Sequence, residues 1–170
     1  EAVEFDEAYA REHGMRDAKV SALPRPASPY NWMVVVEDGD RIDHAQVRLT
    51  QRPALLSALG SDFIDRLAAP YAATHDAAWT RTERFGTAAA ETTVRAAFAA
   101  PELAFFRWFA AHPAFYRMDV GNPSTCVWFQ DLRFITPGRD VVPFRYGACR
   151  EEQGPWEPFE LDAEQRVPVR

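Results

Sequence analysis

The 170-residue sequence lacks a run of about 18 or more apolar residues, which a membrane-spanning helix needs. Positive charge is also scarce, since 19 basic residues stand against 25 acidic ones and the net charge is −6. Nucleic-acid binding needs a basic footprint for the phosphates, so we expect no nucleic-acid partner. The basic residues form no dense cluster, so an anionic lipid surface is not favoured either.

Familiar catalytic motifs are missing as well. The sequence holds no Walker loop, no GxSxG and no GxGxxG, and it has no CxxC pair. The histidines occur without the spacing typical of zinc ligands, and they are His13, His44, His75 and His112. We interpret them as solvated or helix-capping residues, and we predict no metal site in this chain.

Cysteine is limited to two residues, Cys126 and Cys149, which is too few for a disulfide framework. If a hairpin closes around residues 137–138, the two side chains fall nearly opposite each other, and a bridge is geometrically possible. The favoured interpretation is two small buried thiols.

Composition is ordinary for a globular domain, with 47% hydrophobic and 26% charged residues. Residues 1–13 are typical of a helix that Gly14 ends. The proline-rich stretch 20–30 indicates an extended lead-in without periodicity. Residues 31–37 predict a strand that is apolar on both faces. Asp38-Gly39 then predicts a tight turn into a strand over 41–50 with one wet face, nearer a sheet edge.

The middle of the chain is predicted to be helical, with segments at 53–59, 62–69, 88–100 and 101–111. A strand at 114–120 follows. Residues 124–149 then predict two strands joined at Pro137-Gly138. The first of these has no wet face, which is typical of the middle of a sheet.

These elements predict an α+β fold, with an antiparallel sheet of about five strands packed against the central helices. The opening hairpin and three C-terminal strands supply the sheet. We expect one soluble domain over 1–170, with a helix and lead-in at 1–23, a core at 24–150 and a tail at 151–170. The tail is expected to lie across the domain or fray.

Four residues are candidates for ligand binding: Asp131, Arg133, Trp32 and Tyr146. Asp131 and Arg133 are two apart on a strand that otherwise reads as buried, and a buried charge must be paired. They form either a structural ion pair, the favoured interpretation, or the wall of a small polar pocket. The aromatic residues are favoured as core, with an apolar ligand pocket as the alternative, and they are Trp32, Trp108, Trp128, Phe129, Phe144 and Tyr146.

Three segments carry a family resemblance. They are PRPASPYNWMVVVEDGDRIDHAQV at 24–47, FFRWFAAHPAFYRMDV at 105–120, and VWFQDLRF with PFRYG at 127–134 and 143–147. Their order resembles the soluble C-terminal region of bacterial membrane-bound proteins assigned as metal-dependent hydrolases, the inner-membrane group associated with LexA regulation. In that family, transmembrane helices precede the soluble part and carry the presumed metal-binding His and Asp residues.

The resemblance implies a fragment cut from a longer inner-membrane protein, on a side of the membrane that it does not specify. The fragment itself would be soluble, and its start at Glu1 rather than Met fits such a cut. It would have no cofactor of its own, with any divalent metal and the main partner in the membrane portion. Its role would be non-catalytic: stabilising, regulatory, or holding a substrate or partner.

Two alternatives stay open. The first is a free-standing α+β module that binds a small molecule in an aromatic pocket. The second is an independent hydrolase that uses Asp131 with a histidine, which requires an imidazole within hydrogen-bond reach of that carboxylate.

Overall fold

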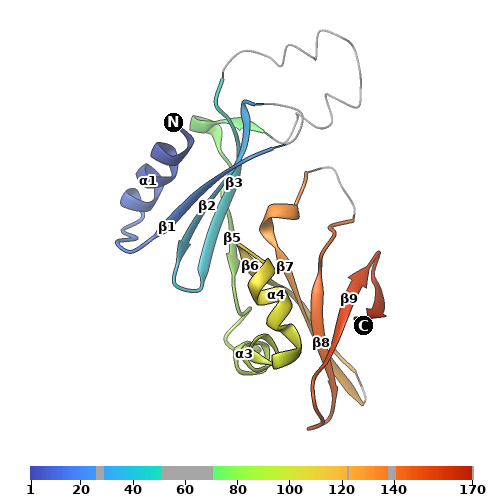
Figure 1. Ribbon diagram of the computed structural model, residues 1–170. Coiled ribbons are helices and arrows are strands. Elements are labelled where there is room, and N and C mark those ends of the chain that lie inside the picture. Colours follow the sequence, from blue (N-terminus) through green and yellow to red (C-terminus); the bar gives the residue numbers. More distant parts are fainter. Residues whose placement is uncertain (26–28, 51–70, 122, 138–140, 170) are drawn as a thin grey trace, which may run out of the picture. The chain divides into compact units, whose positions relative to one another are not determined.

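The computed structural model of the protein describes residues 1–25, 29–50, 71–121, 123–137 and 141–169 (Figure 1). The chain divides into two compact units, Glu1–Thr82 and Glu83–Arg170, called unit 1 and unit 2 below. The strands of the described residues form two five-stranded sheets. The prediction of an α+β fold with antiparallel sheets is confirmed, whereas the prediction of a single sheet is wrong. The helices predicted at 53–59 and 62–69 lie outside the described residues.

In the described residues of unit 1, helix α1 packs against a sheet of order β1-β2-β3-β4, in which β5 also pairs with β3. All the pairings with a determined register are antiparallel except the short parallel contact of β3 with β4. The elements are α1 (Ala2–Glu12), β1 (Lys19–Pro24), β2 (Asn31–Asp38), β3 (Arg41–Arg48), β4 (Ala72–Ala73), the 3₁₀ turn η2 (Thr74–Asp76) and β5 (Thr80–Glu83).

The first helix and the hairpin at Asp38-Gly39 are as predicted, and Gly39 takes the positive φ that such a turn requires. The proline-rich lead-in differs, because β1 pairs with β2 along its whole length. Proline is tolerated there because β1 is an edge strand. The wet face predicted for 41–50 is also wrong at His44, which is buried, and β3 lies inside the sheet rather than near its edge.

Helix α1 covers one face of this sheet and buries one residue per turn, at Ala2, Asp6 and Ala10. The two alanines let the helix approach closely, and the side chains they meet are Val34, Val36, Ala45 and Val47. Beside this layer, the ring of Trp79 stacks on Phe5 and Tyr9. The alanine stripe therefore fixes the helix to the sheet, and it places the carboxyl of Asp6 in the same interface.

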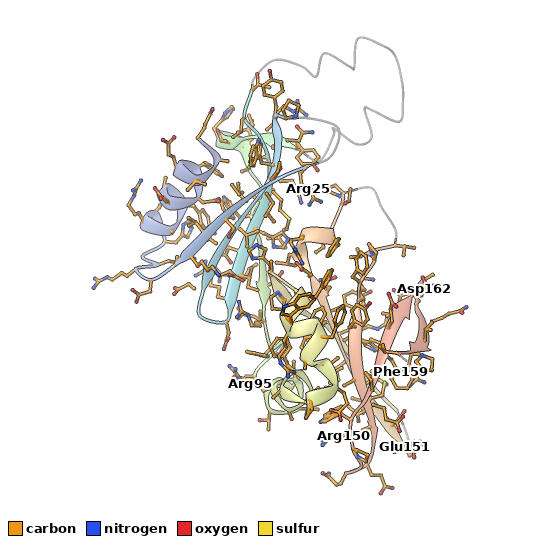
Figure 2. The ribbon with its side chains drawn as sticks, in the orientation of Figure 1. Arg25, Arg95, Arg150, Glu151, Phe159 and Asp162 are labelled. Carbon is orange, nitrogen blue, oxygen red and sulfur yellow. A yellow bond between two sulfur atoms is a disulfide. The ribbon has the colours of Figure 1, made fainter. Side chains whose placement is uncertain are left out.

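Unit 2 contains an antiparallel sheet of order β10-β9-β8-β7-β6. Figure 2 marks the β8–β9 pair by Arg150, Glu151, Phe159 and Asp162. The elements are α3 (Glu91–Ala99), η3 (Pro101–Leu103), α4 (Ala104–Phe109), β6 (Pro113–Val120), β7 (Ser124–Asp131), η4 (Leu132–Phe134), β8 (Tyr146–Glu151), β9 (Glu157–Asp162) and β10 (Gln165–Pro168).

The tail at 151–170 was expected to lie across the domain or fray, but its described residues supply β9 and β10 of the sheet. Its pattern hid these strands because every residue of β10 is exposed, so no apolar alternation marks it. Backbone pairing with the neighbouring strand holds it instead.

The sheet of unit 2 is buried on both faces along β7, as predicted, although the predicted strand continued to Phe134 and β7 ends at Asp131. On one face, Val127 and Phe129 pack against α3 and α4 through Val94, Ala97 and Phe106. On the other face, Cys126 and Trp128 pack with Cys149 and Leu161. Within the described part of the chain, no helix has the length and apolar character needed to cross a bilayer.

Candidate functional site

The carboxylate of Asp131 lies at the corner where β7 ends and turns into η4. It accepts hydrogen bonds from the backbone amides of Ala111, His112 and Arg133, at 3.0, 3.4 and 3.0 Å. The Nε of Arg133 donates to it at 2.7 Å, and a terminal guanidinium nitrogen lies 2.6 Å away. Asp131 has no exposed surface. Its oxygens therefore join the end of α4 to the end of β7.

Arg133 completes this corner. Its guanidinium also donates to the carbonyl of Phe109 at 2.7 Å and lies over the rings of Phe109 and Phe134. Arg133 was predicted to follow Asp131 on the same strand, but β7 ends at Asp131 and the turn brings Arg133 back onto it. The geometry favours the structural ion pair of the two sequence-based interpretations, and the ligand-binding role of the pair stays a prediction.

The hypothesis of an independent hydrolase required an imidazole beside Asp131. His112 does contact this carboxylate, but through its backbone amide. A backbone amide positions the carboxylate and does not exchange a proton with it as a catalytic imidazole would. The contact thus resembles a helix-end anchor.

Tyr146 lies at the start of β8 and lines a pocket of about 320 Å³, wholly within unit 2. Its ring contacts Phe105 and Phe106 of α4, with ring centroids 6.0 and 5.9 Å apart. Burial, followed by the nearby Glu160 carboxylate, raises the pKa of the Tyr146 hydroxyl. The remaining lining residues are Glu102, Leu103, Pro158 and Val169.

The stacked rings of Phe105 and Phe109 join this pocket to the Arg133 corner. Three of the four predicted site residues thus fall in one aromatic cluster of unit 2. Trp32 belongs to unit 1, where its indole donates to the carbonyl of Pro29 at 3.0 Å and packs against the α1 layer.

The predicted aromatic pocket does not assemble from the six residues proposed. Trp128 and Phe129 are fully buried and lie on opposite faces of β7, while Trp108 is 81% exposed. Neighbouring residues on a strand point to opposite faces, so Trp128 and Phe129 cannot share one pocket wall.

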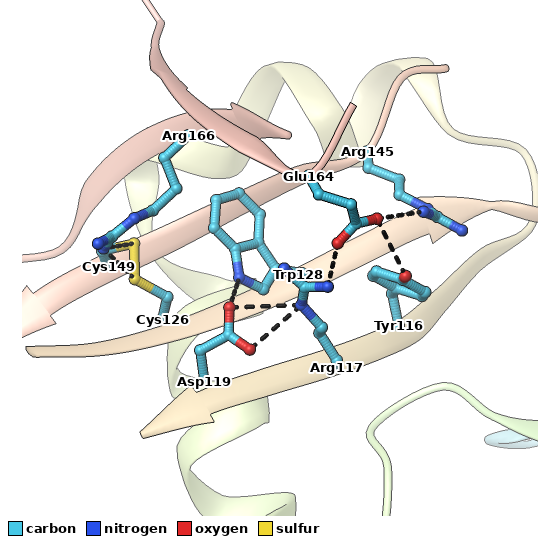
Figure 3. A network of polar contacts seen from close by, with 9 residues as sticks. All are labelled: Tyr116, Arg117, Asp119, Cys126, Trp128, Arg145, Cys149, Glu164 and Arg166. Carbon is cyan, nitrogen blue, oxygen red and sulfur yellow. Dashed lines mark hydrogen bonds and ion pairs between the residues drawn. A yellow bond between two sulfur atoms is a disulfide. The ribbon is translucent and has the colours of Figure 1, made fainter. Parts of the chain in front are cut away.

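Sequence reasoning missed a polar network on the disulfide face of unit 2 (Figure 3). Glu164, at the turn between β9 and β10, contacts Arg117, Arg145 and the hydroxyl of Tyr116. The Arg145 guanidinium also lies 3.6 Å above the Tyr116 ring. Because Glu164 and Arg117 are 47 residues apart, no local sequence signal announces this contact.

The same face carries a disulfide between Cys126 and Cys149. The two residues are directly opposite in the β7–β8 register, as the sequence allowed, but the favoured interpretation of two free thiols is wrong. Nη1 of Arg166 lies 3.1 Å from the sulfur of Cys126 and 3.9 Å from that of Cys149 (Figure 3).

Next to the disulfide, Gly147 leaves room for the indole of Trp128. A Cβ atom at Gly147 would lie 2.5 Å from that ring and 2.4 Å from the carbonyl oxygen of Val127. Trp128 in turn donates its Nε1 hydrogen to Asp119 at 2.8 Å. Glycine at this register position is therefore a packing requirement of the disulfide face.

Unit 1 also holds buried carboxyl groups that the sequence did not reveal. Asp43 accepts from Tyr9 at 2.9 Å and forms ion pairs with Arg41 and Arg81. Burial works to raise the pKa of Asp43, but the hydrogen bonds from Arg41, Tyr9 and Arg81 outweigh it and lower the pKa.

Asp6 differs from Asp43 because its carboxyl group is buried without hydrogen-bond donors from the described residues. No described hydrogen-bond donor reaches either of its oxygens, and the residue has no exposed surface. Burial alone raises the pKa of this carboxyl to about 8.

Among the residues that the structure describes, no group of three His, Cys, Asp or Glu side chains is arranged to hold a metal ion. Comparisons with protein-family models, with curated proteins and with solved structures find no match to this chain.

Proposed function

We propose that this chain is the extramembrane, non-catalytic portion of a bacterial inner-membrane protein related to the proteins assigned as metal-dependent hydrolases. Its role is to hold a substrate or partner near the membrane portion, or to stabilise that portion. The proposal rests on the resemblance of segments 24–47, 105–120, 127–134 and 143–147 to the soluble region of that family.

The arrangement around Asp131 is the observation that best supports a non-catalytic role. The resembling segment VWFQDLRF includes both Asp131 and Arg133. In the fold, this carboxylate accepts three backbone amides and a guanidinium from its own unit. A carboxylate with this many fixed donors suits a structural anchor better than a group that must accept and release a proton.

Metal analysis of two proteins tests the proposal: the purified 170-residue chain, and the natural protein with every residue its gene encodes. After incubation with Zn²⁺, Mn²⁺ or Mg²⁺ and desalting, we expect bound metal and metal-dependent ester or amide hydrolysis only in the longer protein. Stoichiometric metal together with hydrolysis in the 170-residue chain would refute the proposal. A natural protein without any membrane-spanning segment would also refute it.

The pocket beside Tyr146 favours a second candidate, a small-molecule binding module. A volume of about 320 Å³ lies at the lower end of ordinary ligand pockets, which span about 300–1,000 Å³. The walls are mainly apolar, with the Phe105 and Tyr146 rings on one side and the Glu102 carboxylate among the lining groups. These features suit a small aromatic molecule.

Indole is a suitable probe for this candidate. Titration followed by NMR should shift signals from residues that line the pocket, and Phe105→Ala should weaken binding about tenfold because it removes one aromatic wall. Trp108→Ala is the matched control, since Trp108 is an exposed aromatic residue of the same helix that does not line the pocket. This candidate would be ruled out if Trp108→Ala weakened indole binding and Phe105→Ala did not, or if millimolar indole caused no NMR shifts.

A further inference from the structure

We infer that unit 2 matures in an oxidising compartment. There, an oxidant protein of the dithiol-oxidase class transfers its own disulfide to Cys126 and Cys149 and so closes the bond between them. The inference adds a modification and a partner class that the proposed function does not contain. If the proposed function also holds, this chain lies on the extracytoplasmic side of the inner membrane.

The position of the bond in the sheet is the first observation. Cys126 and Cys149 face each other across β7 and β8, the strands that carry the buried centre of unit 2. Both side chains are almost fully enclosed, with exposed fractions of 2% and 6%. Trp128 and Leu161 pack around them. The cross-link therefore belongs to the packed core of this face.

Its enclosure indicates a permanent cross-link. Exchange with a thiol requires a thiolate to reach one of the two sulfurs. The packed side chains and the Arg166 guanidinium surround the bond, so the folded unit resists small-molecule reductants. Structural disulfides persist in oxidising compartments and are rare in the cytosol, where thiols are kept reduced. The chain has only these two cysteines, and both are used in this bond.

Arg166 gives the oxidation step a defined chemistry. Its guanidinium lies nearer the sulfur of Cys126 than that of Cys149, and a cation at that distance stabilises a thiolate. The Cys126 thiolate attacks a sulfur of the oxidant's disulfide and forms a mixed disulfide, which releases one oxidant thiolate. The Cys149 thiolate then attacks the Cys126 sulfur and releases the second. Two electrons pass to the oxidant, and the two cysteine protons go to water or to the oxidant's thiolates.

A hollow of about 610 Å³ beside the β8–β9 turn has Cys149 in its lining, together with Arg150, Glu151 and Glu157. Burial of the sulfurs implies that exchange is fast only before Trp128 and Leu161 are fully packed around them, at a stage when β10 already holds Arg166 beside Cys126. We therefore expect the oxidant to act on the chain during folding.

Thiol trapping in the natural host tests the inference. Cells are quenched in acid, free thiols are blocked with light N-ethylmaleimide, and the protein is reduced and labelled with the heavy reagent. Trypsin releases peptides 118–133 and 146–150, each with one of the two cysteines. We expect nearly all of both peptides to carry the heavy label. Predominantly light label on both peptides in native cells would overturn the inference.

A second measurement tests Arg166 in the purified chain. The reduced, denatured protein is refolded with an excess of oxidised dithiol oxidase, and bond closure is followed by acid quenching. Arg166→Gln should slow closure severalfold at pH 7 and much less at pH 9, where the thiolate forms without help. Arg95→Gln, on the helix-covered side of the unit, is the control and should close at the wild-type rate. Equal closure rates for the wild type and both variants at pH 7 would show that Arg166 does not assist the oxidation step.

These results are separable from those on the proposed function. The trapping experiment reads the redox state of two cysteines whether or not the natural protein is a hydrolase. Metal binding by the longer protein is likewise independent of the disulfide.

Discussion

Units 1 and 2 share one architecture and secure it by different chemistry. In the described residues, unit 1 places helix α1 and unit 2 places helices α3 and α4 on a five-stranded sheet. Unit 1 buries ionisable side chains between its helix and its sheet, at Asp6 and Asp43. Unit 2 joins its central strands by a disulfide and anchors a carboxylate with backbone amides at Asp131. The two units should therefore respond to different changes, unit 1 to pH and unit 2 to removal of its disulfide.

The contrast is sharpest between Asp6 and Asp131, which both have no exposed surface. Asp131 is surrounded by N–H donors that replace the water it lost. Asp6 has no such donors among the described residues, so its neutral form is the stable one and its pKa rises to about 8. Burial of a carboxyl is thus neutral or destabilising according to the donors that the fold supplies.

The largest effect is expected at Asp6. Its folded-state pKa is near 8 and its unfolded pKa near 3.8, so the folded form keeps a proton that the unfolded form has lost. The stability that unit 1 gains from this bound proton is fully present below about pH 4 and is lost as the pH rises toward 8. Asp6→Asn should remove that slope and raise the free energy of unfolding of unit 1 by about 4 kcal/mol at pH 7.

Hydrogen exchange read peptide by peptide, at pH 5 and pH 8, resolves this change in α1. Glu7→Gln is the control, because Glu7 is exposed on the same helix and should leave the pH dependence intact. A wild-type unit 1 whose stability is flat between pH 4 and 8 would contradict the buried, neutral Asp6.

Asp131→Ala should produce the next largest effect, a loss of about 3–5 kcal/mol in unit 2, because the guanidinium and three amides lose their acceptor. Urea unfolding followed by exchange in peptides of unit 2 measures it. Asp162→Asn, at an exposed position of β9, should be near neutral. If Asp131→Ala left stability unchanged, the structural interpretation of the Asp131–Arg133 pair would fail.

Reduction of the Cys126–Cys149 bond should destabilise unit 2 by about 3 kcal/mol, since the bond closes a loop between residues 23 positions apart. For a unit of this size the melting temperature should fall by roughly 10–20 °C. Calorimetry of the oxidised protein and of Cys126→Ser/Cys149→Ser measures the difference. Hydrogen exchange in unit 1 peptides serves as the internal reference. An equal loss of exchange protection in unit 1 would contradict the expectation that the disulfide stabilises unit 2 alone.

The smallest effect is expected at the turn between β9 and β10, where Ala163 and Glu164 both have positive φ, at 43° and 70°. Ala163→Gly should stabilise unit 2 by about 1 kcal/mol, because glycine adopts this conformation without strain. Glu164→Gly relieves similar strain but loses the contacts with Arg117 and Arg145, so its gain should be smaller. A larger gain for Glu164→Gly would mean that these exposed ion pairs add no stability.

Local patterns predicted those elements whose side chains record their environment. The helix at α1, the turn at Asp38-Gly39 and the doubly buried strand β7 each carry a signal within a few residues. Strands β1 and β10 escaped because proline or exposed polar residues hide an edge strand that backbone pairing alone defines. Of the four predicted site residues, Asp131 and Arg133 carried a local signal because they are two residues apart, whereas no local pattern places Tyr146 beside them or separates Trp32 from them.

The sequence by itself determined the α+β class and the burial of β7, because both follow from neighbouring residues and their periodicity. It allowed Cys126 to lie opposite Cys149, on the condition that the hairpin closes around residues 137–138. Only the tertiary structure decided that the described strands divide into two sheets, that the cysteines form a bond beside Arg166, and that Asp131 has four donors while Asp6 has none among the described residues. The physical reason is distance along the chain: these outcomes depend on which remote groups arrive beside a residue, and a pattern of neighbours carries no record of them.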